Sequence, residues 1–94
     1  MMNDVLNGLY EVVLDRRDHP QEGSYTCYLF EKGLDKILKK CGEECSEVII
    51  AAKNGKNEET EEEICDLIYH LLVLLEATGC SIADLEKELA RRHS

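Results

Sequence analysis

An all-α fold is predicted for this chain of 94 residues, and three features of the sequence support the prediction. Apolar residues recur at intervals of three and four over most of the length, which is the spacing of an amphipathic helix. Only one Pro and six Gly interrupt the chain, so few turns are expected. The polar link 54–57 is short enough to fold the two longest apolar patterns into an antiparallel hairpin. We expect a helical bundle that oligomerisation completes, because so short a domain buries little surface alone.

The first part of the chain predicts two helices that flank this hairpin. A first helix is expected over residues 3–16, followed by a polar loop over 16–23. Ser24 then offers an N-cap hydroxyl to a helix that begins near Tyr25. Gly33 is expected to interrupt that helix before the hairpin begins.

The hairpin and a final helix follow. Its first arm is expected to end near Asn54, where Gly55 suits the left-handed position after a helix. The second arm is expected over residues 58–78, and a final helix, capped by Ser81, to about Arg92. The apolar residues expected to face the core are Leu34, Ile37, Leu38, Cys41, Cys45, Val48, Ile49 and Ala52, then Ile64, Leu67, Ile68, Leu71, Leu72 and Leu75, and finally Ile82, Leu85 and Leu89.

The composition disfavours several kinds of partner. The formal net charge of −9 opposes contact with nucleic acid, although metal ions can bridge an acidic surface to a nucleotide. No apolar run is long enough to span a membrane, and the first residues lack the basic and apolar regions that are typical of a signal peptide. We expect one cytoplasmic domain over residues 1–94, without nucleic-acid or membrane contacts. Its five cysteines are expected to be reduced, and those at 41, 45 and 65 to be small core residues.

Two pairs of carboxylates, each pair three residues apart, form the candidate catalytic centre. Glu44 and Glu47 lie on one margin of their helix's apolar stripe, and Glu63 and Asp66 on the matching margin of the next helix. Folding at the short link sets the two pairs at one height, so the four carboxylates are expected to converge. Such oxygen ligands suit Mg²⁺, or alternatively Mn²⁺, with positions left open for phosphate. The alternative is a solvated acidic face, which we expect for Glu58, Glu59, Glu61 and Glu62.

Three charged residues flank the first carboxylate pair. Lys40 and Lys36 lie one and two helical turns before Glu44 and are candidates to bind phosphate. A lysine at this spacing also pairs with the glutamate, and the sequence does not decide between the two roles. Glu43 points further out and is a candidate to accept a proton during catalysis.

Four more residues are weaker candidates. Arg17, Ser24 and Tyr25 border the first loop and are candidates for contact with a substrate. A loop charge and a helix cap explain them equally well. His70 follows Asp66 by one turn, and we expect it to be structural rather than catalytic.

The pattern Glu44-x-x-Glu47 followed by Glu63-x-x-Asp66 resembles the metal motif of the MazG-like all-α nucleotide pyrophosphohydrolases. Longer stretches are similar to the phosphoribosyl-ATP pyrophosphatases, or diphosphatases, of histidine biosynthesis, from Leu6 to Arg92. These stretches are Ser24-Tyr25-Thr26, Gly33-Leu34-Asp35-Lys36-Ile37, Lys40-Cys41-Gly42-Glu43-Glu44, Glu47-Val48-Ile49-Ile50-Ala51-Ala52-Lys53 and Asp66-Leu67-Ile68-Tyr69-His70-Leu71-Leu72-Val73-Leu74-Leu75. The main departures are the cysteines at 41, 45 and 65, where small apolar residues are usual.

The resemblance implies a MazG-like homodimer that hydrolyses 1-(5-phosphoribosyl)-ATP to 1-(5-phosphoribosyl)-AMP and pyrophosphate, the second step of L-histidine biosynthesis. The four carboxylates would hold Mg²⁺, which would bind the triphosphate, neutralise the leaving pyrophosphate and activate water for attack. Lys40, Lys36 and Arg17 would offset phosphate charge. We expect the stand-alone form of the enzyme, without the cyclohydrolase to which this family is often fused.

Two other functions are compatible with the residues. One is a house-cleaning pyrophosphatase for non-standard or deoxynucleoside triphosphates, against which the stretches 24–26 and 69–70 count. The other is a non-catalytic helical dimerisation module with an acidic face. That module would show no change in stability when Mg²⁺ is added.

Overall fold

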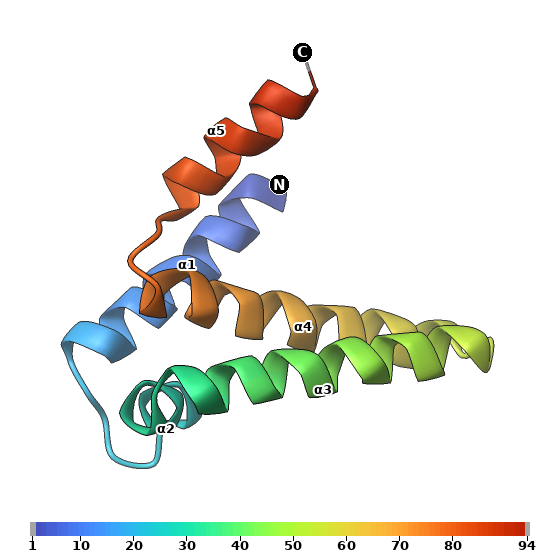
Figure 1. Cartoon of the computed structure of the whole chain (residues 1–94), viewed down its shortest axis with the longest axis horizontal. Coiled ribbons are helices and arrows are strands. Elements are labelled where there is room, and N and C mark those ends of the chain that lie inside the picture. Colours follow the sequence, from blue (N-terminus) through green and yellow to red (C-terminus); the bar gives the residue numbers. More distant parts are fainter. Residues whose placement is uncertain (1, 94) are drawn as a thin grey trace.

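Five helices and no strand form the described part of the chain, which confirms the all-α prediction. The computed structural model describes the backbone of residues 2–93 and the side chains of residues 4–93. The helices are α1 (Met2–Asp18), α2 (Tyr25–Lys32), α3 (Leu34–Lys53), α4 (Asn57–Ala77) and α5 (Ile82–Arg92). Helices α3 and α4 lie side by side as a long antiparallel hairpin (Figure 1). At the end away from its turn, α1 and α2 pack against the hairpin, and α5 projects from it.

Two backbone hydrogen bonds stabilise the turn between α3 and α4, and they form because Gly55 adopts a left-handed backbone conformation. Gly55 has a φ of 68° and its N–H donates to the carbonyl of Ala52 at 3.1 Å. The N–H of Lys56 donates to the carbonyl of Ala51 at 3.3 Å. This pair of bonds is the Schellman ending of a helix. The predicted stop is therefore confirmed, and the short link holds the two long helices antiparallel.

Three other predicted boundaries are also confirmed. The Oγ of Ser24 accepts from the N–H of Cys27 at 3.3 Å and caps α2. The Oγ of Ser81 accepts from the N–H of Asp84 at 3.2 Å and caps α5. Gly33, with a φ of 92°, separates α2 from α3.

The first loop is shorter than the sequence predicted. Helix α1 continues to Asp18, so Arg16 and Arg17 are helical, whereas the sequence placed them in the loop. Basic side chains in the last turn of a helix interact favourably with its dipole, which supports the longer helix. The helix ends close to Pro20, whose ring disfavours helical backbone in the residue before it.

The core lies where α1, α2, α3 and the second half of α4 meet. Each of these helices contributes one side chain that is fully buried. These side chains are Val13, Leu29, Ile37 and Val73. Burying an aliphatic side chain of this size stabilises the fold by about 1.5–3 kcal/mol.

Much of the predicted apolar stripe lies outside this core. Leu38 is 47% exposed and Leu71 is 45% exposed, although both were expected to be buried. The other residues expected inside but found exposed are Leu34, Cys45, Ile49, Ala52, Ile64, Cys65, Leu85 and Leu89. The prediction was wrong for the single chain, because two helices in contact bury only one narrow seam of each. All five cysteines are free thiols, as predicted.

Helix α5 leaves the hairpin at a sharp bend. Gly79, with a φ of 80°, ends α4, and α4 and α5 are bent by 112° relative to each other. The apolar side of α5 is consequently exposed at Leu85 and Leu89. Among the described residues no single helix is long and apolar enough to cross a membrane, although this bent pair together meets the criteria of length and composition.

Tyr10 joins α1 to the end of α4. Its hydroxyl donates to Oε2 of Glu76 at 2.6 Å, and Arg17 pairs with Oε1 of the same carboxylate. We expect Tyr10→Phe to lower the free energy of unfolding by about 2 kcal/mol, because a hydrogen bond to a charged group contributes about 1.5–3 kcal/mol. Urea unfolding followed by circular dichroism measures this change. Tyr28→Phe, at an exposed tyrosine, is the control, and equal stability of the two variants would contradict the prediction.

Candidate active site

Three carboxylates from the two hairpin helices converge. One oxygen from each of Glu44, Glu63 and Asp66 lies within 4.8 Å of the other two. Glu44 is buried, Glu63 is half-buried and Asp66 is exposed, so the group opens to solvent on the side of Asp66. Glu47 lies beside the group, and its carboxyl is within hydrogen-bonding reach of that of Glu63. The structure therefore brings three of the four predicted carboxylates together, and Glu47 is near enough to raise the pKa of Glu63 and of Glu44.

Two oxygens of this group are buried without a hydrogen-bond donor. They are Oε2 of Glu44 and Oε2 of Glu63, the buried side-chain oxygens without a partner in the described part of the chain. Desolvated oxygens of this kind cost free energy unless a proton or a cation satisfies them. A set of donors made only of carboxylate oxygens suits a hard divalent cation. The residues present therefore fit a metal ion.

Without a cation, Glu44 and Glu63 hold protons more tightly than usual. The hydrogen bond with Glu47, followed by desolvation and by the charges of Glu47, Asp66 and Glu44, raises the pKa of Glu63 to about 7. Desolvation raises the pKa of Glu44, and the neighbouring carboxyl of Glu47 raises it further. A proton thus replaces part of the charge that a cation would supply.

The pKa of Glu63 predicts how the stability of the metal-free protein depends on pH. The pKa of Glu63 is about 7 in the folded chain, against an ordinary value of 4.5. Between these values the folded state binds more protons than the unfolded state, so stability falls as the pH rises. We expect the melting temperature in EDTA to fall between about pH 5 and pH 8, and added Mg²⁺ to reverse the fall. Glu63→Gln is expected to weaken this dependence, and an identical pH profile in that variant would contradict the assignment.

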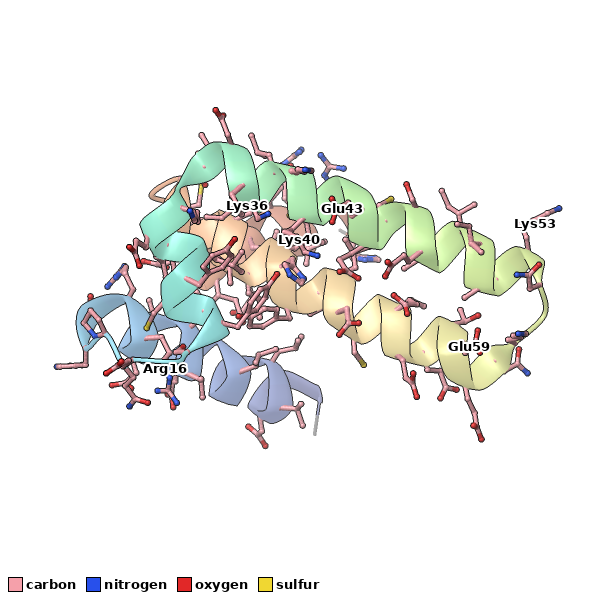
Figure 2. The ribbon with its side chains drawn as sticks, turned by 90° about the horizontal axis from the view of Figure 1, so that it is seen from below. Arg16, Lys36, Lys40, Glu43, Lys53 and Glu59 are labelled. Carbon is pink, nitrogen blue, oxygen red and sulfur yellow. The ribbon has the colours of Figure 1, made fainter. Side chains whose placement is uncertain are left out.

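Lys40 lies beside the carboxylate group and pairs with Glu43 and with Glu44. Its Nζ is 3.2 Å from Oε2 of Glu43 and 3.6 Å from Oε1 of Glu44. The hydrogen bond between Lys40 and Glu43 raises the pKa of the lysine and lowers the pKa of the glutamate. Figure 2 shows Lys36, Lys40 and Glu43 following one another along α3. Both members of the pair are therefore charged at neutral pH, and the ammonium group lies next to the carboxylate group.

His70 and Tyr25 connect α2 to the turn of α4 that carries Asp66. The Nδ1 of His70 lies 2.7 Å from the backbone carbonyl of Asp66, and a carbonyl only accepts, so Nδ1 carries the proton. In the neutral ring Nε2 is then an acceptor, and the hydroxyl of Tyr25 donates to it at 3.0 Å. His70 is buried, as expected for a structural role, and it fixes the position of Tyr25 relative to Asp66.

Two residues predicted to contact the substrate have other partners in the single chain. The hydroxyl of Ser24 caps the N-terminus of α2. Arg17 pairs with Asp18 and with Glu76, which follows Asp66 by ten residues on α4. That spacing is about 15 Å along the helix, because each residue rises about 1.5 Å. The single chain therefore does not bring Arg17 to the carboxylates.

Two contacts near the site were not singled out in the sequence. The rings of Tyr25 and Tyr28 are stacked, with centroids 6.0 Å apart and an interplanar angle of 22°. The hydroxyl of Thr26 is hydrogen-bonded to that of Tyr69 on α4. The spacing of three residues between Tyr25 and Tyr28 was an available signal, since it sets both on one helical face. The bond between Thr26 and Tyr69 joins distant segments and left no such signal.

Comparison with known proteins decides the family. The model of the family described as phosphoribosyl-ATP pyrophosphohydrolase matches residues 6–93. The chain belongs to this family. The match covers α2 to α5 and most of α1, including every residue of the carboxylate group. The resemblance found in the sequence is thereby confirmed.

Several relatives are similar to this chain over most of its length. The phosphoribosyl-ATP pyrophosphatase of Clostridium botulinum is 60% identical over 90 residues, covering 96% of this chain and 82% of the relative. The phosphoribosyl-ATP pyrophosphatase of Listeria welshimeri is 59% identical over 88 residues, covering 94% and 84%. The histidine biosynthesis bifunctional protein HisIE of Oceanobacillus iheyensis is 57% identical over 81 residues, covering 86% of this chain and 38% of that protein.

Proposed function

We propose that this chain hydrolyses phosphoribosyl-ATP to phosphoribosyl-AMP and pyrophosphate, a step of histidine biosynthesis. The observation that carries the proposal is the convergence of Glu44, Glu63 and Asp66 beside Lys40, in a chain that belongs to this family. The names of the relatives supply the substrate and the pathway. Under this proposal residues 1–94 act as one domain, and the location is the cytoplasm, as the sequence predicted.

Four carboxylates are proposed to hold the metal ion. Glu44, Glu63 and Asp66 supply the converging oxygens, and Glu47 joins them through its contact with Glu63. Mg²⁺ is the expected ion, with Mn²⁺ as the alternative, because the donors are all oxygen. When bound, the ion neutralises charge on the triphosphate and makes the attacked phosphorus more electrophilic. The two buried oxygens without a donor support this role.

Lys40 and Glu43 are proposed to assist at the phosphates. The ammonium of Lys40 donates hydrogen bonds to phosphate oxygens and offsets the charge that grows on the leaving pyrophosphate. Glu43, ionised beside Lys40, accepts the proton of the attacking water. The water oxygen bonds to the α-phosphorus, and the bond from this phosphorus to the bridging oxygen of the β-phosphate breaks. The adjacent Tyr25 borders the substrate, while Ser24 and Arg17 stay predictions.

We also propose that two copies of the chain form a homodimer. A groove of about 670 Å³ runs between α1, α3, α4 and α5. Its lining is almost wholly apolar and includes the exposed side chains of Leu38, Leu71 and Leu85; Glu86 is its one charged residue. Such a surface on a chain with a net charge of −9 favours an apolar partner, and exposed apolar patches of this kind mark interaction sites. A second copy offers the same apolar side of α5 in return.

Incubation of the purified protein with phosphoribosyl-ATP and Mg²⁺ tests the activity. We expect release of pyrophosphate in equimolar amount with phosphoribosyl-AMP, and loss of the reaction in EDTA. A panel with deoxynucleoside and non-standard triphosphates tests the alternative substrate class. Faster hydrolysis of any simple triphosphate than of phosphoribosyl-ATP would replace the proposed substrate, and no Mg²⁺-dependent change in melting temperature would favour a non-catalytic module.

A further inference from the structure

A basic patch lies next to the acidic centre. The chain has 11 Lys and Arg against 20 Asp and Glu, yet four lysines fall between residues 32 and 40. Lys32 is the last residue of α2, and the other three lysines lie at the start of α3, before the carboxylates of that helix. Lys40 already pairs with Glu43 and Glu44, so the question is what the lysines further from the carboxylates do.

Lys32 and Lys36 both lie over one exposed aromatic ring. Their Nζ atoms are 5.8 and 6.0 Å from the centroid of Tyr28. Within residues 4–93 no carboxylate lies within ion-pair distance of either ammonium group. Two cations held near each other without a direct ion pair form a ready site for an anion. Tyr28 is 38% exposed, so a ligand can reach its ring.

This patch has a fixed place relative to the metal centre. Tyr28 stacks on Tyr25, and Tyr25 is hydrogen-bonded to His70, whose other ring nitrogen binds the carbonyl of Asp66. A short chain of contacts therefore connects the patch to a carboxylate of the centre. Lys36 precedes Glu44 by two turns of α3, about 12 Å at a rise of about 1.5 Å per residue. An adenine flanked by two ribose rings can span such a separation.

We propose that Tyr28, Lys32 and Lys36 form a distal subsite that binds the phosphoribosyl group of the substrate. This inference rests on the proposed function, because phosphoribosyl-ATP carries phosphate at both ends. The triphosphate lies at Lys40 and the carboxylates, and the two further lysines bind the single phosphate at the other end. The ring of Tyr28 packs against the ribose that carries this single phosphate. The subsite distinguishes phosphoribosyl-ATP from ATP, which lacks the second phosphate.

Steady-state kinetics with Lys36→Gln and Tyr28→Leu tests the subsite. We expect Lys36→Gln to raise the KM for phosphoribosyl-ATP about tenfold, the size of effect expected from one lost charge-assisted hydrogen bond. Tyr28→Leu is expected to raise the same KM, because it removes the ring that packs against the substrate. The inhibition constant of ATP should change less than about twofold, because ATP does not reach the distal lysines. Lys53→Gln is the matched control, since it removes the same charge near the hairpin turn, far from the patch (Figure 2). Equal loss of affinity for both nucleotides, or for neither, would overturn the proposal.

A titration with ribose 5-phosphate separates this proposal from the proposed function. We expect the fragment to shift the NMR signals of Tyr28 and the Lys36 side chain in the wild-type protein, and the shift of the Tyr28 signals to disappear in Lys36→Gln. Failure of the wild type to hydrolyse phosphoribosyl-ATP would refute the proposed activity while these shifts still report on the subsite. Shifts confined to residues outside the patch would refute the subsite itself.

Discussion

Asp66→Asn is expected to reduce the release of pyrophosphate from phosphoribosyl-ATP about a thousandfold. The substitution keeps the size of the side chain and removes the charge that helps to hold the cation. A divalent ion at a phosphoryl-transfer site contributes several kcal/mol, and each 1.36 kcal/mol corresponds to a factor of ten in rate. Asp66 is exposed, so the fold is expected to survive its substitution. A coupled assay for pyrophosphate measures the rate, and calorimetric titration measures Mg²⁺ affinity in the same variant.

Glu61→Gln is the matched control for this experiment. It removes one carboxylate from α4, but Glu61 lies outside the converging group and is exposed. Glu47→Gln extends the test to the fourth carboxylate, and we expect it to abolish activity as well. Wild-type rates in both Asp66→Asn and Glu47→Gln would contradict the metal assignment. A normal Mg²⁺ affinity without activity would instead give Asp66 a role in the reaction other than binding the cation.

The sequence predicted the carboxylate group well because the features that create it are local. Helical periodicity sets the angle of Glu44 and Asp66 around their helices, and the link at Gly55 sets their height along the hairpin. Neither depends on distant contacts. The burial of Leu38 and Leu71 was predicted wrongly, since it depends on which surfaces meet in three dimensions. An apolar stripe indicates that a face needs a partner, but it does not say whether the same chain provides that partner.

The arrangement of side chains around Tyr28 was not predicted because part of it also depends on the three-dimensional fold. Its stacking on Tyr25 follows from their spacing on one helix, but the approach of Lys36 depends on the bend at Gly33. A residue with a positive φ between two helices sets an angle that sequence spacing alone does not reveal. The arrangement of the lysines around the ring is therefore visible only in the folded chain.

Leu85→Glu is expected to convert the protein from a dimer to a monomer. Leu85 lines the apolar groove from α5 and is 42% exposed in the single chain. In the proposed dimer this side chain is buried, so a glutamate there would place an unpaired charge in an apolar interface. A loss of about 3 kcal/mol, the size of an interface hot spot, raises the dissociation constant of the dimer about 100-fold. Sedimentation at a series of concentrations measures this shift.

Val12→Glu separates this effect from a general cost of surface charge. Val12 is 45% exposed on α1, nearly the same as Leu85, and it does not line the groove. We expect Val12→Glu to keep the dimer, and Leu85→Glu to lower the melting temperature in a way that depends on protein concentration. A wild-type protein that sediments as a monomer, or a Leu85→Glu variant that stays dimeric, would contradict the proposed dimer interface at this groove. Because the core of the single chain leaves leucines of α3, α4 and α5 exposed, the stability of this fold and its dimerisation are expected to be lost together.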